Sequence, residues 1–423
     1  MSNEQNVPAL RFPEFGEVLK PEKLGDVATF SKGRGISKSD IEEGGAIPCV
    51  RYGELYTTYG EIIDEIESYT NLDPADLVIS EPHDVIVPAS GETQIDIATA
   101  SCVLKGGVAI SGDLNIVKSP INGIFLAYYL GSAKKYEIAS MAQGNSVVHL
   151  YAKQLKTLQL NLPSPPEQHK IATFLAAVDE RLRLLEAQRE ELLRYKEGVM
   201  QRIFDQELRF KDTDGKDFPE WDEKRVGEVF DFHRTNSYSR AKLSYEEGEI
   251  FNIHYGDIHS KYGSSFFLDR KLTPRIRSKE DTSKIDVSSF CQEGDLIVAD
   301  ASEDYKDVGK VVEVIQIGDA KVVAGLHTFL LRQNGNVIVK GFGRYLFQSK
   351  IIRSQIMRMA TGTSVLGISK TNMAKVKMPV PEEREQDKII GILEELDSKL
   401  ESLRNTIDAG KSWKQGLLQN LFA

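Results

Sequence analysis

Apolar residues recur at alternating steps of four and three along two long stretches of the chain, residues 163–204 and 381–422. Such a heptad pattern runs one apolar stripe down a helix and is typical of a coiled-coil strand. The predicted seam residues are Ile171, Leu175, Val178, Leu182, Leu185 and Leu192 in the first helix and Ile389, Leu393, Leu396, Leu400, Leu403 and Ile407 in the second. A long helix cannot bury such a stripe alone, so we expect the two helices to pack on each other.

The two helical stretches belong to a duplication that covers the whole chain. Residues 142–204 align without a gap with residues 360–422. The earlier run that starts at Ile47, IPCVRYGELYTTYG, is echoed by IFNIHYGDIHSKYG from Ile250. Matching order and spacing predict an internal pseudo-two-fold repeat, in which a globular piece and then a long helix occur twice.

Each globular piece mixes short β-rich runs with turn residues and ends in a helical pattern. The run Asp84–Val87 predicts a strand, and the segments Phe125–Ala142 and Phe342–Ala360 each predict one helix. The fold class that follows is α+β. We expect globular domains over residues 1–160 and 206–377, and helical regions over 163–205 and 381–423.

Length and composition indicate an ordinary globular protein. A chain of 423 residues allows two or more domains, each with its own core. The apolar runs are too short to span a bilayer, and the polar start MSNEQNVPAL does not resemble a signal peptide. Cys49, Cys102 and Cys291 are far apart and form no CxxC, which argues against a disulfide framework and fits a reducing cytoplasm. We therefore expect a cytoplasmic protein with no membrane partner.

No catalytic motif occurs in the sequence. The chain has no GxxxxGK[ST] phosphate loop, no HExxH and no GxSxG. The Asn/Asp-Pro-Pro-aromatic loop expected of an adenine methyltransferase is also missing. We predict no catalytic residue and no metal ligand in this chain.

The overall charge of the chain does not favour nucleic-acid binding, whereas local groups of Lys and Arg do. The net charge of −10 speaks against nucleic acid as a whole, but phosphate contacts depend on where cations gather. Between Tyr52 and Leu104 there is no Lys or Arg, whereas acidic residues are frequent. This stretch is expected to face away from phosphate or toward a basic partner.

The remaining chemistry is that of base edges and phosphates. Arg, Lys, Asn, Gln, Ser and Thr hydrogen-bond to bases and phosphates, and aromatic residues lie interleaved with them here. The candidates in the first copy are Lys32, Arg34, Lys38, Arg51, Tyr52, Tyr56, Gln143, Asn145 and Ser146. Those in the second copy are Arg234, Asn236, Tyr238, Arg240, Lys242, His254, Tyr255, His259, Lys261, Thr361, Thr363 and Ser364.

The Pro-x-x-x-Glu-Gln-x-Lys-Ile helix start, the Arg/His-Tyr-Gly-Glu/Asp run and the doubled layout together resemble the DNA specificity subunit of type I restriction-modification systems. The resemblance covers essentially the entire chain. It implies two target recognition domains that each read half of a split double-stranded DNA sequence. It also implies that the helices pack as an antiparallel coiled coil and set the distance between the halves.

The same resemblance implies the partners and the division of labour. Two modification (methyltransferase) subunits would bind the helices, and two restriction (motor and nuclease) subunits would join outside. Adenine N6 methylation with S-adenosylmethionine, and cleavage with ATP and Mg²⁺, would then belong to the partners, with no cofactor in this chain. Two alternatives remain open at this point: a coiled-coil scaffold for protein interactions without a DNA role, and a free-standing DNA-modifying enzyme.

Overall fold

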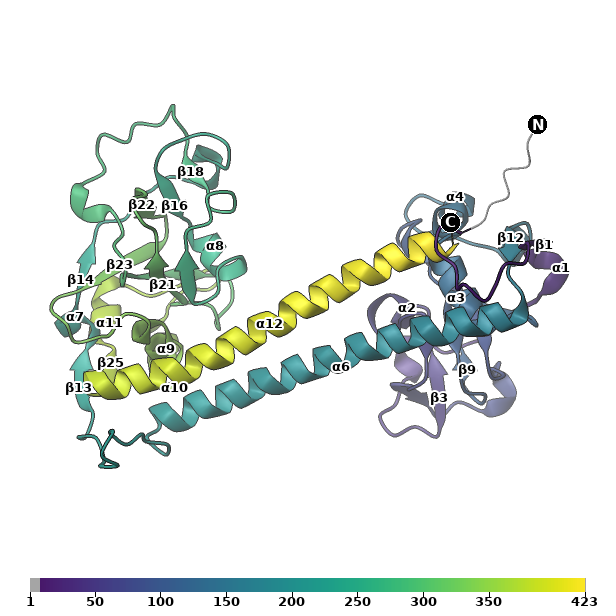
Figure 1. Ribbon diagram of the computed structural model, residues 1–423, viewed down its shortest axis with the longest axis horizontal. Coiled ribbons are helices and arrows are strands. Elements are labelled where there is room, and N and C mark those ends of the chain that lie inside the picture. The colour runs from purple at the N-terminus through teal and green to yellow at the C-terminus, as the bar shows by residue number, and fades with distance from the viewer. Residues whose placement is uncertain (1–7, 423) are drawn as a thin grey trace. The chain divides into compact units, whose positions relative to one another are not determined.

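The computed structural model describes residues 8–422 of the chain (Figure 1). These residues form two compact units. The first unit holds residues 8–188 and 403–422, and the second holds residues 189–402. Residues 1–7, which include most of the polar start of the chain, lie outside the described residues.

Two long helices, α6 (Pro165–Phe204) and α12 (Glu383–Phe422), each contribute a segment to both units. Each compact unit combines the start of one helix with the end of the other. The expected boundaries at 160, 205 and 377 stay predictions. Within residues 8–422, no helix is long and apolar enough to cross a membrane.

The first unit is built on a five-stranded sheet of order β2-β10-β6-β8-β4. Its strands are β2 (Thr29–Lys32), β10 (Leu114–Lys118), β6 (Asp84–Pro88), β8 (Ser101–Val103) and β4 (Ile62–Ile63). The smaller sheets contain β5 (Ser68–Thr70), β3 (Ile47–Val50), β9 (Ala109–Ile110), β1 (Lys20–Lys23), β12 (Gln159–Leu162), β7 (Ser90–Gly91) and β11 (Val148–His149). Its short helices are α1 (Leu24–Val27), α2 (Glu54–Thr57), α3 (Gly123–Gly131), α4 (Lys135–Met141) and α5 (Ala152–Leu155).

The second unit repeats this topology, with a five-stranded sheet of order β14-β23-β19-β21-β17. Its strands are β14 (Phe230–His233), β23 (Thr328–Gln333), β19 (Leu296–Ala299), β21 (Val311–Gln316) and β17 (Ser265–Phe267). The smaller sheets contain β15 (Leu243–Ser244), β18 (Arg275–Ile276), β16 (Phe251–Ile253), β22 (Val322–Ala324), β13 (Asp222–Arg225), β25 (Lys377–Val380), β20 (Ala301–Ser302) and β24 (Leu366–Gly367). Its short helices are α7 (Val226–Val229), α8 (Tyr255–Ser260), α9 (Phe342–Gln348), α10 (Lys350–Met359) and α11 (Lys370–Lys375). The matching strand orders confirm the predicted internal repeat and the α+β class.

Both faces of each five-stranded sheet are buried. In β6, Val85 and Val87 pack with the helical layer of α3 and the long helices, whereas Ile86 points into a second core beneath α2 and β3. In β19, Leu296 and Ile297 divide in the same way between two cores. Successive side chains of a strand alternate between faces, so a sheet that is covered on both sides needs a continuous apolar run.

The helical segment before residue 143 and its counterpart before residue 361 are each broken in two, so the prediction of one helix each over Phe125–Ala142 and Phe342–Ala360 is wrong. In the first unit, the hydroxyl of Ser132 donates to the carbonyl of Tyr128 where α3 ends. In the second unit, Ser349 adopts extended backbone angles, and its side chain accepts from the amide of Ile352 at the start of α10. The apolar pattern continues across both breaks because the two helices of each pair bury residues in the same core.

Within each unit the segments of α6 and α12 pack antiparallel. In the first unit, Phe174 contacts Trp413 at a ring-centroid distance of 6.2 Å, and Glu186 pairs with Lys411 at 2.6 Å. A Cβ atom at Gly410 would lie 2.8 Å from Cδ2 of Leu182, so the two backbones approach closely there. All of the predicted seam residues are buried or half-buried.

A lysine, an aspartate and a tyrosine meet between the helices of each unit, at equivalent positions of the repeat. In the first unit, Lys414 Nζ lies 2.7 Å from Asp179 Oδ1, and Tyr128 Oη donates to Asp179 Oδ2 at 2.5 Å. Burial by itself lowers the pKa of Lys414, but the carboxylates of Glu61 and Asp179 outweigh burial and raise it. In the second unit, Lys196 pairs with Asp397, which also accepts from Tyr345 Oη at 2.7 Å. Paired polar groups between two packed helices favour one register, because a shifted register would leave them unpaired.

Replacing Lys414 with methionine is expected to lower the free energy of unfolding by about 2 kcal/mol, because Asp179 and Tyr128 lose a charged partner. The pair is only partly buried, with Asp179 29% exposed, so the loss is smaller than for a fully buried pair. Lys411→Met removes an exposed ion pair on the same helix and is expected to cost less than about 1 kcal/mol. Denaturant unfolding of both variants checks the difference, and equal midpoints would contradict a register role for Lys414.

Candidate nucleic-acid interface

In both units, several of the candidate residues lie around the same edge of the five-stranded sheet, where its strands begin or end. In the first unit, this is the edge where β6 ends at Pro88, β10 begins at Leu114 and β2 ends at Lys32. In the second unit, β19 ends opposite the start of β23, where Ala299 pairs with Thr328. The chain leaves this edge as β7 in the first unit and as β20 in the second. We call these two places the polar edges.

The polar glycine loops, residues 143–149 and 361–367, are tied to the polar edges. Strand β11 of the first loop pairs with β7, and β24 of the second loop pairs with β20. Gly144 and Gly362 have φ angles of 130° and 136°, a backbone conformation that favours glycine. The exposed polar side chains of the loops include Gln143, Asn145 and Ser146 in the first unit and Thr361, Thr363 and Ser364 in the second.

The repeated runs that start at Ile47 and Ile250, which we call the Tyr-Gly runs, contain the helices α2 and α8, and both helices contact the same strands. Tyr56 Oη, on α2, donates to the carbonyl of Ser90 at 3.0 Å. His259 Nε2, on α8, lies 3.1 Å from the carbonyl of Ala301 and therefore acts as a donor. The two contacts are equivalent in the repeat. The structure thus brings the Tyr-Gly runs and the glycine loops together in both units.

The acidic residue of each Tyr-Gly run is buried and paired with an arginine. In the first unit, Glu54 Oε1 lies 2.9 Å from Arg51 Nη2. Asp257 accepts from Nη1 and Nη2 of Arg240, both at 2.9 Å, and Lys261 Nζ lies 3.2 Å away. The bond to Asp257 is the main reason that the pKa of Arg240 is raised. Arg51 and Arg240 therefore stabilise the fold at the edge of the site, and their charge is already compensated.

The other cations of the first unit are exposed. Lys32 ends β2, and Arg34 and Lys38 follow it, with Arg34 Nη2 3.9 Å from Asp76. The amide of Arg34 donates to the carbonyl of Ile110, which keeps this segment beside the end of β9. Tyr52 is also exposed and meets Tyr56 edge-on.

Several candidates of the second unit are held by their own neighbours. Asn236 Nδ2 donates to the carbonyl of Ala324 at 2.7 Å, and Tyr238 Oη donates to the carbonyl of Asp281 at 2.6 Å. Lys242 Nζ lies 3.0 Å from Glu280 Oε2. His254 is buried at the start of α8, where Nδ1 accepts from the amide of Gly256, and burial lowers its pKa. Arg234 is exposed, and Tyr255 is half-buried with its ring 5.3 Å from that of His327.

Four polar residues at the edges were not among the sequence candidates: Ser90 and Asp113 in the first unit, and Asp300 and His327 in the second. Ser90 Oγ lies 3.3 Å from Asp113 Oδ1 and 3.2 Å from His149 Nδ1. His327 Nδ1 lies 3.5 Å from Asp300 Oδ1. Each of the four lies within two residues of the end of a core strand, and this position along the chain is the signal that could have found them.

A polar cavity of about 580 Å³ lies at the polar edge of the second unit. Arg234, Asn236, Asp300 and His327 are among its lining residues. Burial raises the pKa of Asp300, and the nearby imidazole of His327 opposes that shift.

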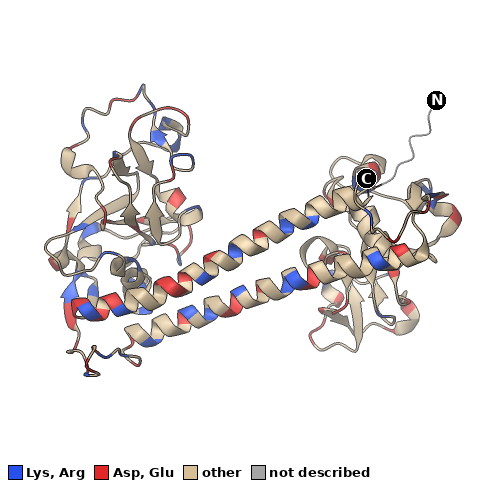
Figure 2. Cartoon of the chain, in the orientation of Figure 1, with Lys and Arg blue, Asp and Glu red and all other residues tan. Residues whose placement is uncertain are grey.

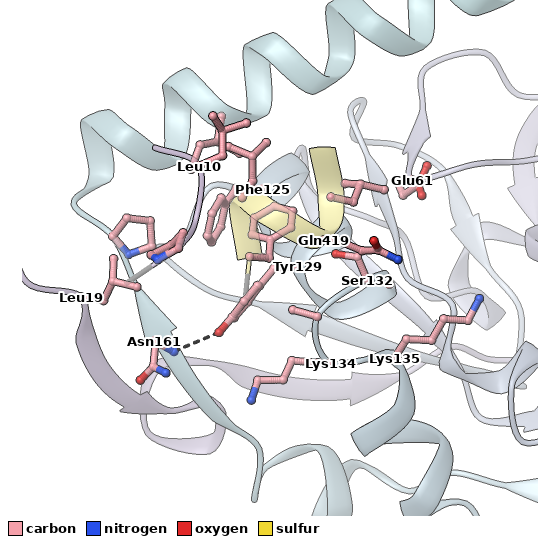
Figure 3. Close-up of a pocket in the computed structure, with 18 of the residues that line it drawn as sticks. Leu10, Leu19, Glu61, Phe125, Tyr129, Ser132, Lys134, Lys135, Asn161 and Gln419 are labelled. Atoms are coloured by element: carbon pink, nitrogen blue, oxygen red, sulfur yellow. Dashed lines mark hydrogen bonds between the residues drawn. The ribbon is translucent and has the colours of Figure 1, made fainter. Parts of the chain in front are cut away.

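A second cavity, of about 710 Å³, lies in the first unit at the end of α12 (Figure 3). Phe125 and Tyr129 form one wall, and Tyr129 Oη accepts from the amide of Asn161 at 3.1 Å. None of the candidates of the first unit lines this cavity. Within the described residues, no group of three or more His, Cys, Asp or Glu side chains is placed to hold a metal ion.

The Glu-Gln pair at the start of each long helix is structural. Glu385 is fully buried and accepts from Nε and Nη2 of Arg209 at 2.8 and 3.0 Å and from Trp221 Nε1 at 2.8 Å. Its counterpart Glu167 accepts from Arg11 through two bonds of 2.6 Å. The side chain of the neighbouring Gln386 accepts from the amide of Val339 and donates to the carbonyl of Pro381. These hydrogen bonds and ion pairs connect the start of each long helix to the chain segments packed around it.

Arg209→Met is expected to lower the free energy of unfolding by about 3–5 kcal/mol, because it leaves the buried carboxylate of Glu385 without a cation. The double variant Arg209→Met/Glu385→Gln removes the buried charge and keeps an acceptor for Trp221, so it is expected to recover much of the loss. Thermal unfolding of both variants measures this. A double variant less stable than Arg209→Met alone would contradict the stated cause.

Charges of both signs alternate along α6 and α12 (Figure 2). In the first unit, the acidic stretch 52–104 is partly neutralised by lysines that follow it, since Lys105 lies 3.0 Å from Asp64 and Lys118 lies 2.7 Å from Glu81. The Lys and Arg residues near the polar edges are therefore interspersed with acidic residues and do not form one continuous basic surface.

By its fold, the chain is a duplicated two-unit protein with an equivalent polar edge on each unit. The family model described as "Type I restriction modification DNA specificity domain" matches residues 18–194 and again residues 219–409. The chain therefore belongs to this family and carries two copies of its domain. The prediction of a specificity subunit of a type I restriction-modification system is confirmed at this level.

Relatives of known identity agree with this assignment. The specificity subunit of the type I restriction enzyme MjaVIII from Methanocaldococcus jannaschii is 23% identical over 417 residues, which are 95% of this chain and 91% of that protein. The crystal structure of a type I restriction-modification S subunit from M. genitalium has a TM-score of 0.58 at 16% identity and covers 99% of both chains. A structure concerned with complex assembly and conformational transition of the type I R-M system also has a TM-score of 0.58. Its sequence is 18% identical, and the match covers 96% of this chain and 98% of that one. At these identities the two structures show the fold alone.

Proposed function

We propose that this chain reads the DNA target of a type I restriction-modification complex, with each globular domain reading one half of a bipartite double-stranded sequence. The observation that carries the proposal is the duplication of one scaffold with different polar side chains at its edge. Two domains with the same scaffold are suited to the same task of binding DNA. Different polar residues at their edges are suited to reading different base sequences.

The helices α6 and α12 serve as the spacer between the two half-sites and as the docking surface for two modification subunits. A chain with an internal two-fold presents the same surface twice, which supports two copies of one partner. Two restriction subunits join outside. Methylation of adenine N6 with S-adenosylmethionine, and cleavage with ATP and Mg²⁺, are the work of these partners, and this chain acts in the cytoplasm without a cofactor of its own.

The test is DNA binding by the complex of this chain with its modification subunit, measured on duplex DNA at several salt concentrations. The logarithm of the binding constant is expected to fall linearly with the logarithm of salt, with a slope of about −0.9 for each phosphate contacted. A complex that forms but shows no preference among DNA sequences would favour the scaffold alternative. S-adenosylmethionine bound by this chain alone would favour the free-standing enzyme.

A further inference from the structure

The two polar edges share their backbone and differ in their side chains. In the first unit, the amide of Ala89 donates to the carbonyl of Asp113 at 2.8 Å. In the second unit, the amide of Asp300 donates to the carbonyl of His327 at 3.1 Å. The two bonds join the same positions of the repeat. Alanine and aspartate in one unit therefore stand where aspartate and histidine stand in the other.

The neighbouring glycine loops are identical at some positions, whereas Gln143 and Asn145 of the first loop correspond to Thr361 and Thr363 of the second. Gly144, Ser146 and Val147 of the first loop are matched in identity by Gly362, Ser364 and Val365 of the second. The two valines are 50% and 53% exposed, so the match is not a requirement of a buried core. Residues that are the same in both units suit a task that is the same at both half-sites, such as positioning the DNA backbone. Residues that differ on a common scaffold suit discrimination between bases.

We infer that Asp113 in the first unit and the His327–Asp300 pair in the second are specificity-determining residues, one set for each half-site; this inference rests on the proposed function. Asp113 is half-buried, and its carboxylate can only accept, which suits the amino group of cytosine N4 or adenine N6. His327 is 52% exposed, its Nδ1 faces Asp300, and its ring lies against Tyr255, which leaves Nε2 as the polar atom for a base edge. The polar cavity beside it provides further donors and acceptors.

Asparagine is the informative substitution at both positions. Asp113→Asn keeps the shape of the side chain and adds donors to an acceptor-only group. His327 has a φ angle of 56°, and asparagine is among the residues that tolerate this left-handed conformation. Both variants are therefore expected to fold. Ser146→Ala and Ser364→Ala, in the matched loops, are the controls.

The experiment selects bound DNA from a library randomised over both half-sites, using the complex with the modification subunit. Asp113→Asn is expected to change the base preference by about tenfold or more at one or two adjacent positions of one half-site, and to leave the other half-site as it is. His327→Asn is expected to change the base preference at the other half-site and to leave the first half-site as it is. The two serine variants are expected to weaken binding to all sequences alike.

Two results would overturn the inference: an unchanged preference in both asparagine variants, or a uniform loss of affinity over all sequences. Both leave the proposed function standing, provided that the unaltered complex selects a bipartite sequence. If the unaltered complex selects no bipartite sequence, the proposed function itself fails.

Discussion

Exchange of residues 217–377 for the same region of another member of the family is expected to change one half of the methylated DNA sequence and to leave the other half unchanged. Each globular domain has its own cores and its own polar edge, so replacing one domain leaves the other intact. The readout is the set of methylated adenines in cells that carry the hybrid complex. The expected change is complete, because a wrong half-site contains several mismatched base pairs that each cost about 1–3 kcal/mol.

The matched control exchanges residues 13–160 instead, and it is expected to change the opposite half-site. Arg209 and Glu385 lie outside the exchanged residues and keep their contact in the first hybrid. Trp221 lies inside them, so tryptophan should be retained at that position to preserve its bond to Glu385. If either exchange altered both halves together, independent reading by the two domains would be wrong.

Insertion of one heptad into each long helix, near Gln188 and near Thr406, is expected to lengthen the preferred gap between half-sites by about three base pairs. Seven residues keep the alternating four-three seam in register, so the helices are expected to pack as before. Each helix grows by ~10 Å, which corresponds to about three base pairs at 3.4 Å each. The two insertion points are equivalent in the repeat, so both helices lengthen together.

Three base pairs also rotate the duplex by roughly 100°, since a full turn takes about 10–10.5 pairs. The alternative expected result is therefore a loss of binding, because one domain would face the wrong side of the groove. Binding to targets with a range of gap lengths distinguishes the two. A four-residue insertion is the control, because it shifts the seam and is expected to disturb packing. Normal affinity for the original gap after the heptad insertion would show that the helices do not measure the DNA.

The long helices and the duplication were predictable because both signals are local. The seam follows from residue spacing alone, and the repeat follows from two ungapped alignments. The break at Ser132 was missed because the apolar period continues through it, and the serine acts through hydrogen bonds that periodicity does not record. The same reason applies at Ser349.

The polar edges were only partly predictable. Strand register across the five-stranded sheet brings Ser90 and Asp113 together, and sequence alone does not state that register. His327 stood in no motif, and its left-handed backbone is visible only in three dimensions. Arg240 was predicted to bind DNA because arginine commonly contacts phosphate. In the structure it pairs instead with the buried carboxylate of Asp257.

The central claim is that one chain reads two separate half-sites for a methyltransferase complex. Sequencing of methylated adenines, in cells that carry this chain with its modification subunit, tests this claim most directly. We expect a single bipartite motif, with two short specific halves separated by a gap of fixed length and unspecified sequence, and no such methylation when the chain is deleted. An uninterrupted motif, or the same methylation without the chain, would contradict it.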